Sequence, residues 1–134
     1  MRKLWELGFA CMRAPASGAK VRKSIQPDLI AIRNDKVFVM EVKTRRNSRV
    51  VYIEREQVEK VREWARRAGS NSRAFIAVYF DRSLGWRFVP LEKLTVTEGG
   101  NYRVTREDAE RGLELIHLKM LSEKNLRKID SFSD

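Results

Sequence analysis

The chain has 134 residues, enough to bury one hydrophobic core and too few for two ordinary domains. It contains no apolar run of about eighteen residues and begins without a continuous apolar stretch, so the sequence predicts neither a membrane span nor export. Its 28 lysines and arginines against 18 aspartates and glutamates give a formal charge of +10, which favours a polyanion such as nucleic acid as partner. The single cysteine, Cys11, excludes an internal disulfide and a cysteine-rich zinc site, and its apolar neighbours indicate a buried position.

The chain begins with a predicted short helix, a strand and a long loop. Residues 1–7 have the pattern of a helix that ends at Gly8, and the apolar residues 9–13 fit a strand. Residues 14–27 are rich in polar residues, proline and glycine, which predicts an exposed loop. Basic residues cluster here and again after residue 43, in predicted loops rather than on an amphipathic helix, which argues against binding to a membrane surface. The basic residues of these two loops that we expect to bind DNA are Lys20, Arg22, Lys23, Arg45, Arg46 and Arg49.

A hairpin and a βα unit are predicted next. Two β-rich runs, residues 28–33 and 36–43, flank Asn34-Asp35, a pair that favours a two-residue turn. Residues 50–53 fit a short strand, and residues 54–68 repeat apolar side chains at the three-to-four spacing of a helix with one buried face.

The second half of the chain is predicted to complete a sheet. Residues 73–80 form an apolar run typical of a strand buried on both faces, and residues 86–89 fit the next strand. Small edge strands are expected at 95–97 and 102–104, and the capping box Thr105 to Asp108 predicts a helix running toward Leu121. The fold class is therefore α/β, with a central mixed β-sheet flanked by helices. We expect one domain over residues 1–121 and a polar tail over residues 122–134.

The end of the predicted hairpin gathers groups that can do chemistry. Strand alternation puts Glu41 and Lys43 on one side of their strand, and the two-residue turn brings Asp28 opposite that end. Adjacent carboxylates repel, and a hard cation such as Mg²⁺ removes that repulsion, while the lysine can orient water or stabilise a pentacovalent phosphate. The alternative is a strand-end salt bridge worth about 0 to 1 kcal/mol. The sole histidine, His117, is far away in sequence, which argues against zinc and for a structural or surface position.

These residues also match a known signature. Pro27-Asp28, followed after twelve residues by Glu41-Val42-Lys43, fits the PD…EVK pattern of the PD-(D/E)XK nucleases. Further matching segments are Gly8-Phe-Ala10, Arg13-Ala-Pro-Ala-Ser-Gly18, Glu56-Gln-Val-Glu-Lys60 and Gly85-Trp-Arg-Phe88. With this setting, roughly residues 1 to 120 resemble the archaeal Holliday junction resolvases of the Hjc kind. The resemblance implies a restriction-endonuclease-like fold and a structure-selective DNA endonuclease that resolves four-way junctions by phosphodiester hydrolysis with Mg²⁺, or Mn²⁺ as a substitute.

The resemblance also implies roles for single residues. Asp28 and Glu41 would hold the metal, and Lys43 would assist the nucleophilic water. Arg13 and Ser17 match positions that the family places near the active site, where they would contact the scissile backbone; the alternatives are an ordinary strand-end charge and an ordinary loop residue.

The implied partners are branched DNA and a second copy of the chain, without a membrane or an organic cofactor, at the nucleoid in the cytoplasm. A twofold dimer would present identical sites to two equivalent strands. Candidate interface elements are the strands over 73–80 and 86–89 and the neighbouring helix, with core packing as the alternative.

One feature of the family pattern falls outside this sequence. The resolvases carry a glutamate in their first helix, at a position that would lie upstream of Met1, and Glu6 is too close to Gly8 to be that residue. Either the chain has lost its true N-terminus or its metal site is incomplete. Two other functions therefore stay open: a more general PD-(D/E)XK DNA nuclease, and a junction- or DNA-binding protein with an incomplete active site.

Overall fold

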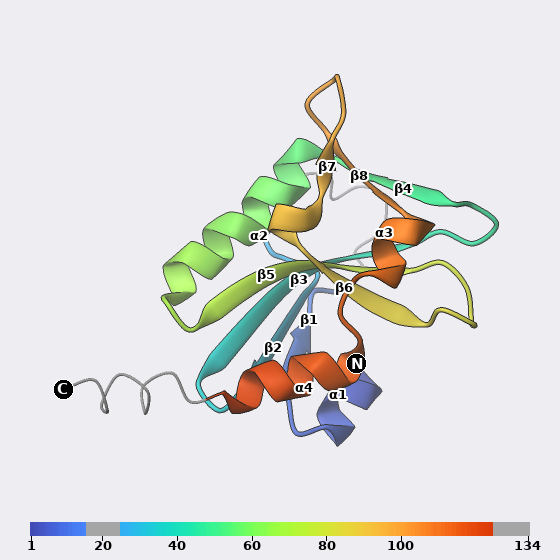
Figure 1. Ribbon diagram of the computed structural model, residues 1–134. Coiled ribbons are helices and arrows are strands. Elements are labelled where there is room, and N and C mark those ends of the chain that lie inside the picture. The colour runs from blue at the N-terminus through green and yellow to red at the C-terminus, as the bar shows by residue number, and fades with distance from the viewer. Residues whose placement is uncertain (16–24, 125–134) are drawn as a thin grey trace.

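The computed structural model describes residues 1–15 and 25–124 and has two β-sheets with helices on both faces of the larger one (Figure 1). The helices are α1 (Arg2–Glu6), α2 (Arg55–Ala68), α3 (Arg106–Glu110) and α4 (Leu115–Glu123), and a short 3-10 helix, η1, spans Leu91–Lys93. The strands are β1 (Ala10–Arg13), β2 (Leu29–Arg33), β3 (Lys36–Thr44), β4 (Val50–Ile53), β5 (Ser72–Tyr79), β6 (Trp86–Pro90), β7 (Thr95–Val96) and β8 (Tyr102–Thr105).

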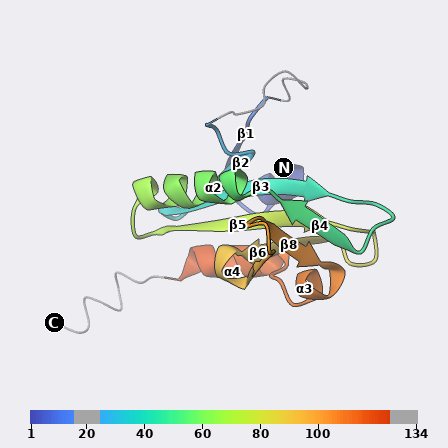
Figure 2. The same cartoon turned by 90° about the horizontal axis from the view of Figure 1, so that it is seen from above.

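The larger sheet has the strand order β1-β2-β3-β5-β6 and mixes parallel and antiparallel pairs. β3 and β5 are parallel, joined by a crossover through β4 and α2, whereas every other pair in this sheet is antiparallel. Seen from above, α2 and α4 lie on opposite sides of the sheet (Figure 2). This architecture confirms the predicted α/β class with a central mixed sheet. No helix in the described part of the chain is long and apolar enough to cross a membrane.

The predicted hairpin is present with its two-residue turn. Asn34 and Asp35 have φ angles of 51° and 60°, the left-handed pair of a type I′ turn, and Arg33 pairs with Lys36 across it. The turn therefore fixes the register of β2 against β3, so that Leu29 lies opposite Met40.

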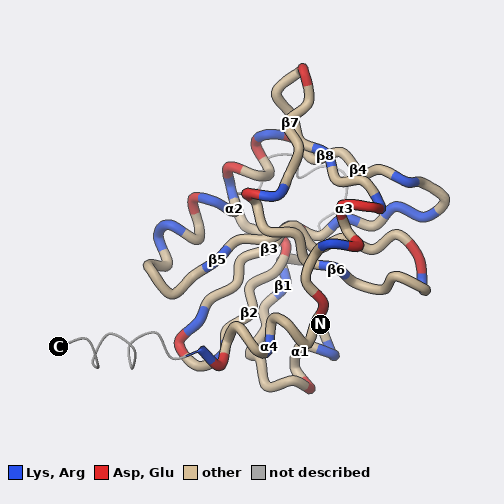
Figure 3. The backbone as a smooth tube through the Cα atoms, in the orientation of Figure 1, with Lys and Arg blue, Asp and Glu red and all other residues tan. Residues whose placement is uncertain are grey.

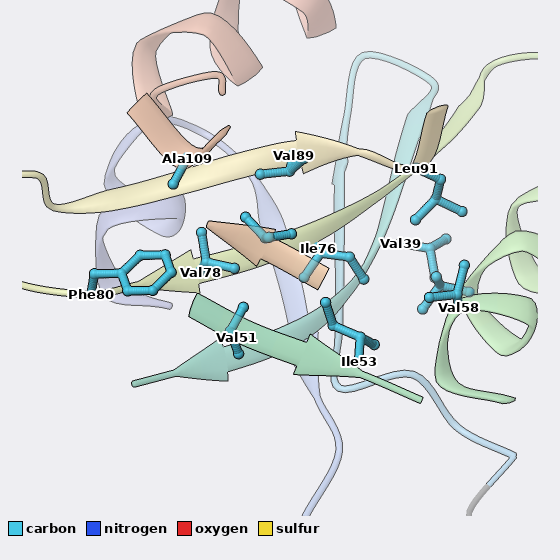
Figure 4. Close-up of a cluster of buried hydrophobic side chains, with 12 residues drawn as sticks. Val39, Val51, Ile53, Val58, Ile76, Val78, Phe80, Val89, Leu91 and Ala109 are labelled. Carbon is cyan, nitrogen blue, oxygen red and sulfur yellow. The ribbon is translucent and has the colours of Figure 1, made fainter. Parts of the chain in front are cut away.

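Strand β5 is buried on both faces, as its apolar run predicts. One face contributes Ile76 and Val78 to a core with α2, β4 and β8, which Figure 4 shows. The other face contributes Phe75 and Ala77 to a second core beneath α1 and α4. Because its side chains fill both cores, β5 offers little free surface, and core packing accounts for this candidate interface element.

The structure corrects two predictions for the second half of the chain. Residues 102–104 do not form an edge strand, since β8 lies between β4 and β7 in the smaller sheet. The C-terminal helix is not continuous either: Thr105 and Asp108 form the expected capping box, but α3 ends at Glu110. Phe88 and Leu113 then exchange two backbone hydrogen bonds of 2.8 and 2.9 Å, and this extension of the sheet interrupts the helix.

The end of helix α4 and the burial of Cys11 also differ from the sequence-based expectation. Helix α4 continues past Leu121 to Glu123, and Ser122 is buried and accepts a hydrogen bond from Arg33 at 3.0 Å. The start of the predicted tail thus packs on the domain, while residues 125–134 lie outside the described part. Cys11 is only partly buried on β1.

Candidate active site

Asp28 and Glu41 lie side by side where β2 begins and β3 nears its end. The backbone N–H of Asp28 donates to Oε1 of Glu41 at 3.2 Å, and the N–H of Val42 donates to Oδ2 of Asp28 at 2.9 Å. This reciprocal pair continues the hairpin register by one step beyond Leu29 and Met40. Both carboxylates are therefore held in place by the backbone of the opposite strand.

The Glu41 side chain is almost fully buried, with 2% of its surface exposed. Burial raises its pKa because the charged form loses water, and the nearby charge of Asp28 raises it further. Lys60 of α2 opposes both effects, since its Nζ lies 3.2 Å from Oε2 of Glu41. The site thus combines two adjacent carboxylates with a cation supplied by the covering helix.

Lys43 lies in the same electrostatic environment at the end of β3. Burial lowers the pKa of its ammonium group, while the charges of Glu41, Asp28 and Glu54 act in the opposite direction. The structure therefore brings together the three residues of the PD…EVK signature, although their catalytic roles stay predictions. The cluster is more than an exposed strand-end salt bridge, because the ion pair of the buried Glu41 is with Lys60.

Arg13 lies at the edge of this cluster. It pairs with Leu29 at the end of β1, and the next residue, Ala14, donates a backbone hydrogen bond of 3.0 Å to the carbonyl of Asp28. Its side chain is exposed. Arg13 is thus one strand away from the carboxylates, while Ser17, Lys20, Arg22 and Lys23 lie outside the described residues.

The second predicted DNA-binding segment is the exposed loop between β3 and β4, which carries basic residues at the margin of the molecule (Figure 3). Arg45 donates to the Thr44 carbonyl at 2.7 Å, and Arg49 forms an ion pair of 2.5 Å with Glu107. Arg46 is exposed as well. The loop follows Lys43 directly, so bound phosphates would meet these arginines next to the carboxylate cluster.

Sequence reasoning missed the contribution of α2. Lys60 forms an ion pair with Glu41, and the charge of Glu54 raises the pKa of Lys43. The sequence pattern assigns no role to either residue, although segment 56–60 matches the family. Helical spacing does indicate that Gln57, Lys60 and Trp64 share one face of the helix, because they recur every three to four residues. What the spacing lacks is the position of the helix over the sheet, which only the tertiary packing provides.

The donor set fits a hard divalent cation held by few protein ligands. Asp28 and Glu41 offer two fixed carboxylates, and Mg²⁺ at enzyme sites that bind phosphate is usually held by one or two carboxylates together with water and substrate phosphate. Within residues 1–15 and 25–124, no group of three or more acidic, histidine or cysteine side chains is placed to hold a metal. His117 caps α4, with its Nδ1 accepting from the N–H of Glu114 at 2.9 Å, in agreement with a structural position.

Comparisons with known proteins give the family of the chain. The family model described as archaeal Holliday junction resolvase (Hjc) matches residues 1–127. The chain belongs to this family. Among its relatives is the crossover junction endodeoxyribonuclease Hjc of Sulfurisphaera tokodaii, 43% identical over 131 residues, which are 97% of this chain and 88% of the relative. The protein of the same name from Sulfolobus acidocaldarius is 34% identical over the same shares.

A solved structure supports the same assignment. The Hjc of Archaeoglobus fulgidus, described as a Holliday junction resolvase from an archaeal hyperthermophile, matches with a TM-score of 0.74 and 27% identity over 89% of this chain and 88% of that one. The family and fold predictions are thereby confirmed. The protein is a nuclease that resolves branched DNA. This confirms the enzyme class predicted from the sequence.

Proposed function

We propose that this resolvase cuts four-way DNA junctions by Mg²⁺-dependent hydrolysis at the cluster of Asp28, Glu41 and Lys43. The observation that carries the proposal is the reciprocal hydrogen bonding at 3.2 and 2.9 Å, which fixes the two carboxylates next to each other. Preorganised oxygen donors of this kind are what a hard cation needs beside a phosphate.

Asp28 and Glu41 would hold the metal, with Mn²⁺ as a substitute for Mg²⁺. When bound, the cation supplies positive charge that polarises the scissile phosphate and activates water for attack. Lys43 donates from its ammonium to the water or to the phosphate oxygens, because its partly buried charge is close to both carboxylates. No covalent enzyme intermediate is involved.

Arg13, Ser17 and the two basic loops would bind the DNA backbone. Arg13 projects from the strand next to Asp28, where a guanidinium can hold a phosphate with two hydrogen bonds. The loop from Arg45 to Arg49 continues this positive surface beyond Lys43. These contacts position the junction and carry no base sequence information.

The test is cleavage of an end-labelled four-way junction beside a linear duplex, with Mg²⁺ and with chelator. Asp28→Asn and Glu41→Gln should each lower the cleavage rate at least about 100-fold while junction binding persists, because each removes a charged metal ligand and keeps the side-chain shape. Asp35→Asn, in the exposed turn of the same hairpin, is the matched control and should cut normally. Wild-type rates in Asp28→Asn would refute the metal site, and equal cutting of linear duplex would favour a general nuclease.

We also propose that the resolvase acts as a homodimer, since a twofold assembly matches two equivalent strands of a junction. A groove of about 1180 Å³ lies between α2 and the β2–β3 face of the sheet. Its exposed wall includes Ile25 and Ile32, 78% and 44% exposed, and Trp64 anchors Ile25 through a hydrogen bond of 2.7 Å. A groove that combines isoleucine and valine side chains of the sheet with charged side chains of α2 favours a second copy as its occupant.

Light scattering of the purified protein tests the dimer. Ile32→Arg should reduce the mass to that of one chain, because a charge in the groove opposes burial. Ile116, on α4, is similarly exposed at 49%, so Ile116→Arg is the control and should leave the mass unchanged. If only Ile116→Arg dissociates the dimer, the interface lies on α4 and not in the groove.

The nuclease domain would comprise residues 1–121 together with the last turn of α4. As an enzyme of junction DNA, the protein would work at the nucleoid in the cytoplasm, which fluorescence microscopy of a tagged chain can test.

A further inference from the structure

Both oxygens of Glu41 are already engaged by the protein itself. Oε1 accepts from the Asp28 backbone at 3.2 Å, and Oε2 faces the Lys60 ammonium, also at 3.2 Å. The lysine side chain is 17% exposed and the glutamate 2%, so this ion pair is shielded from water. A divalent cation that ligates Glu41 through Oε2 must therefore share or replace the contact with Lys60.

Lys60 is held in this position by the packing of α2. Its neighbours Val58 and Val61 are fully buried against the sheet, which fixes the turn of helix that carries the lysine above β3. Without Lys60, the buried charge of Glu41 would lose its ion pair at Oε2 and keep the repulsion of Asp28, which the more distant ammonium of Lys43 offsets only in part. An uncompensated buried charge destabilises a fold strongly, so a counter-charge is needed whenever no metal is bound.

The structure also offers the displaced ammonium another position. Lys60 lines the groove between α2 and the sheet, and Glu56 and Glu63 line the same groove. These glutamates lie four residues before and three after Lys60, within reach on the same helix face. Glu63 already binds Arg66 and Arg67, whereas Glu56 makes no ion pair within the described part of the chain. The flexible lysine stem can therefore exchange Glu41 for Glu56 without moving the helix.

We propose that Lys60 is a resident counter-cation for Glu41: it neutralises and orients this carboxylate in the metal-free protein and yields Oε2 when a divalent cation enters. Lys60 is thus a positioning residue that sets the metal concentration at which the site fills. The inference rests on the proposed metal role of Asp28 and Glu41, and it adds a competition between an internal and an external cation.

Binding and stability measurements without DNA test the competition. Mn²⁺ is titrated calorimetrically into the full chain, and urea unfolding is followed in chelator and in saturating Mn²⁺. Lys60→Met should bind Mn²⁺ at least about 10-fold more tightly than wild type, because the competing charge is gone. It should also unfold at lower urea in chelator, a deficit that saturating Mn²⁺ narrows or removes by linkage.

Three further variants separate this role from a merely structural one. Lys60→Arg retains the charge and should keep wild-type stability in chelator with weak Mn²⁺ binding. Lys60→Gln keeps a hydrogen-bond donor without charge and should bind Mn²⁺ tightly even if the methionine variant folds poorly. Lys93→Met removes one exposed charge on η1 and should match wild type in both measurements.

The outcomes distinguish this inference from the proposed function. Wild type that binds no Mn²⁺ would overturn both. Wild type that binds Mn²⁺, with Lys60→Gln binding equally or more weakly, would overturn the competition alone and leave the metal role of Asp28 and Glu41 intact.

Discussion

Replacing Lys43 with methionine should separate catalysis from stability. Burial and the nearby charge of Arg45 lower the pKa of this lysine, and together they outweigh the acidic residues around it, which raise it. Its charged form is therefore less favourable in the folded protein than in water. For a base with a lowered folded pKa, the folded state binds fewer protons, and stability rises as pH increases through that pKa toward 10.5. At neutral pH the charge on Lys43 therefore costs stability, and Lys43→Met removes this cost.

The magnitude follows from what the two side chains contact. Methionine has a similar length and buries an apolar stem without a charge, so the free energy of unfolding should stay equal or rise by about 0.5 to 1 kcal/mol. Cleavage should fall about 100- to 1000-fold, the usual effect of losing one charged group that stabilises a transition state.

Lys36→Met is the matched control, at the opposite end of the same strand β3. The Lys36 Nζ donates to the Lys124 carbonyl at 2.7 Å, and the residue is 9% exposed. Its loss should lower the free energy of unfolding by about 1 to 2 kcal/mol, since a hydrogen bond from a charged donor disappears. Cleavage should be unchanged because Lys36 is distant from the carboxylates along β3.

The assay combines urea unfolding in chelator with single-turnover cleavage of a four-way junction. The reasoning is refuted if Lys43→Met unfolds as readily as Lys36→Met, which would show that the Lys43 charge stabilises the fold. A wild-type cleavage rate in Lys43→Met would independently refute its role in the reaction.

Three further predictions concern charge and turn geometry. The hydrogen bond from Arg106 holds the pKa of Asp81 well below its ordinary value of 3.8, so Asp81→Asn should be less stable than wild type at neutral pH, with a difference that shrinks as pH falls below that value. Asp35→Gly should raise the unfolding free energy by up to about 1 kcal/mol, because the left-handed strain relieved at a φ of 60°, about 1 to 2 kcal/mol, exceeds the extra unfolded-state entropy of glycine, about 0.5 to 1 kcal/mol; an unchanged urea midpoint would contradict this. Arg46→Ala should weaken junction binding at low salt and reduce the salt slope by about 1, and an unchanged slope would exclude a phosphate contact.

Local sequence patterns determined much of the fold and the centre of the site. The β-rich runs around Asn34-Asp35 predicted both the hairpin and its register, since a two-residue turn leaves one alignment of the strands. That register alone places Asp28 against Glu41. Helix α2 and the buried strand β5 were also predictable from the sequence, because helical periodicity and apolar runs are local properties.

Tertiary packing decided the features that depend on long-range pairing. The helix after Thr105 breaks because Leu113 pairs with Phe88, a contact with no local signal, and β8 becomes a central strand because β4 returns to its open edge. The ion pair of Lys60 with Glu41 joins residues 19 positions apart and exists only once α2 lies over β3. A sequence specifies such a contact through the whole core, since burying the valines of α2 fixes the height and rotation of the helix and hence the place of its lysine.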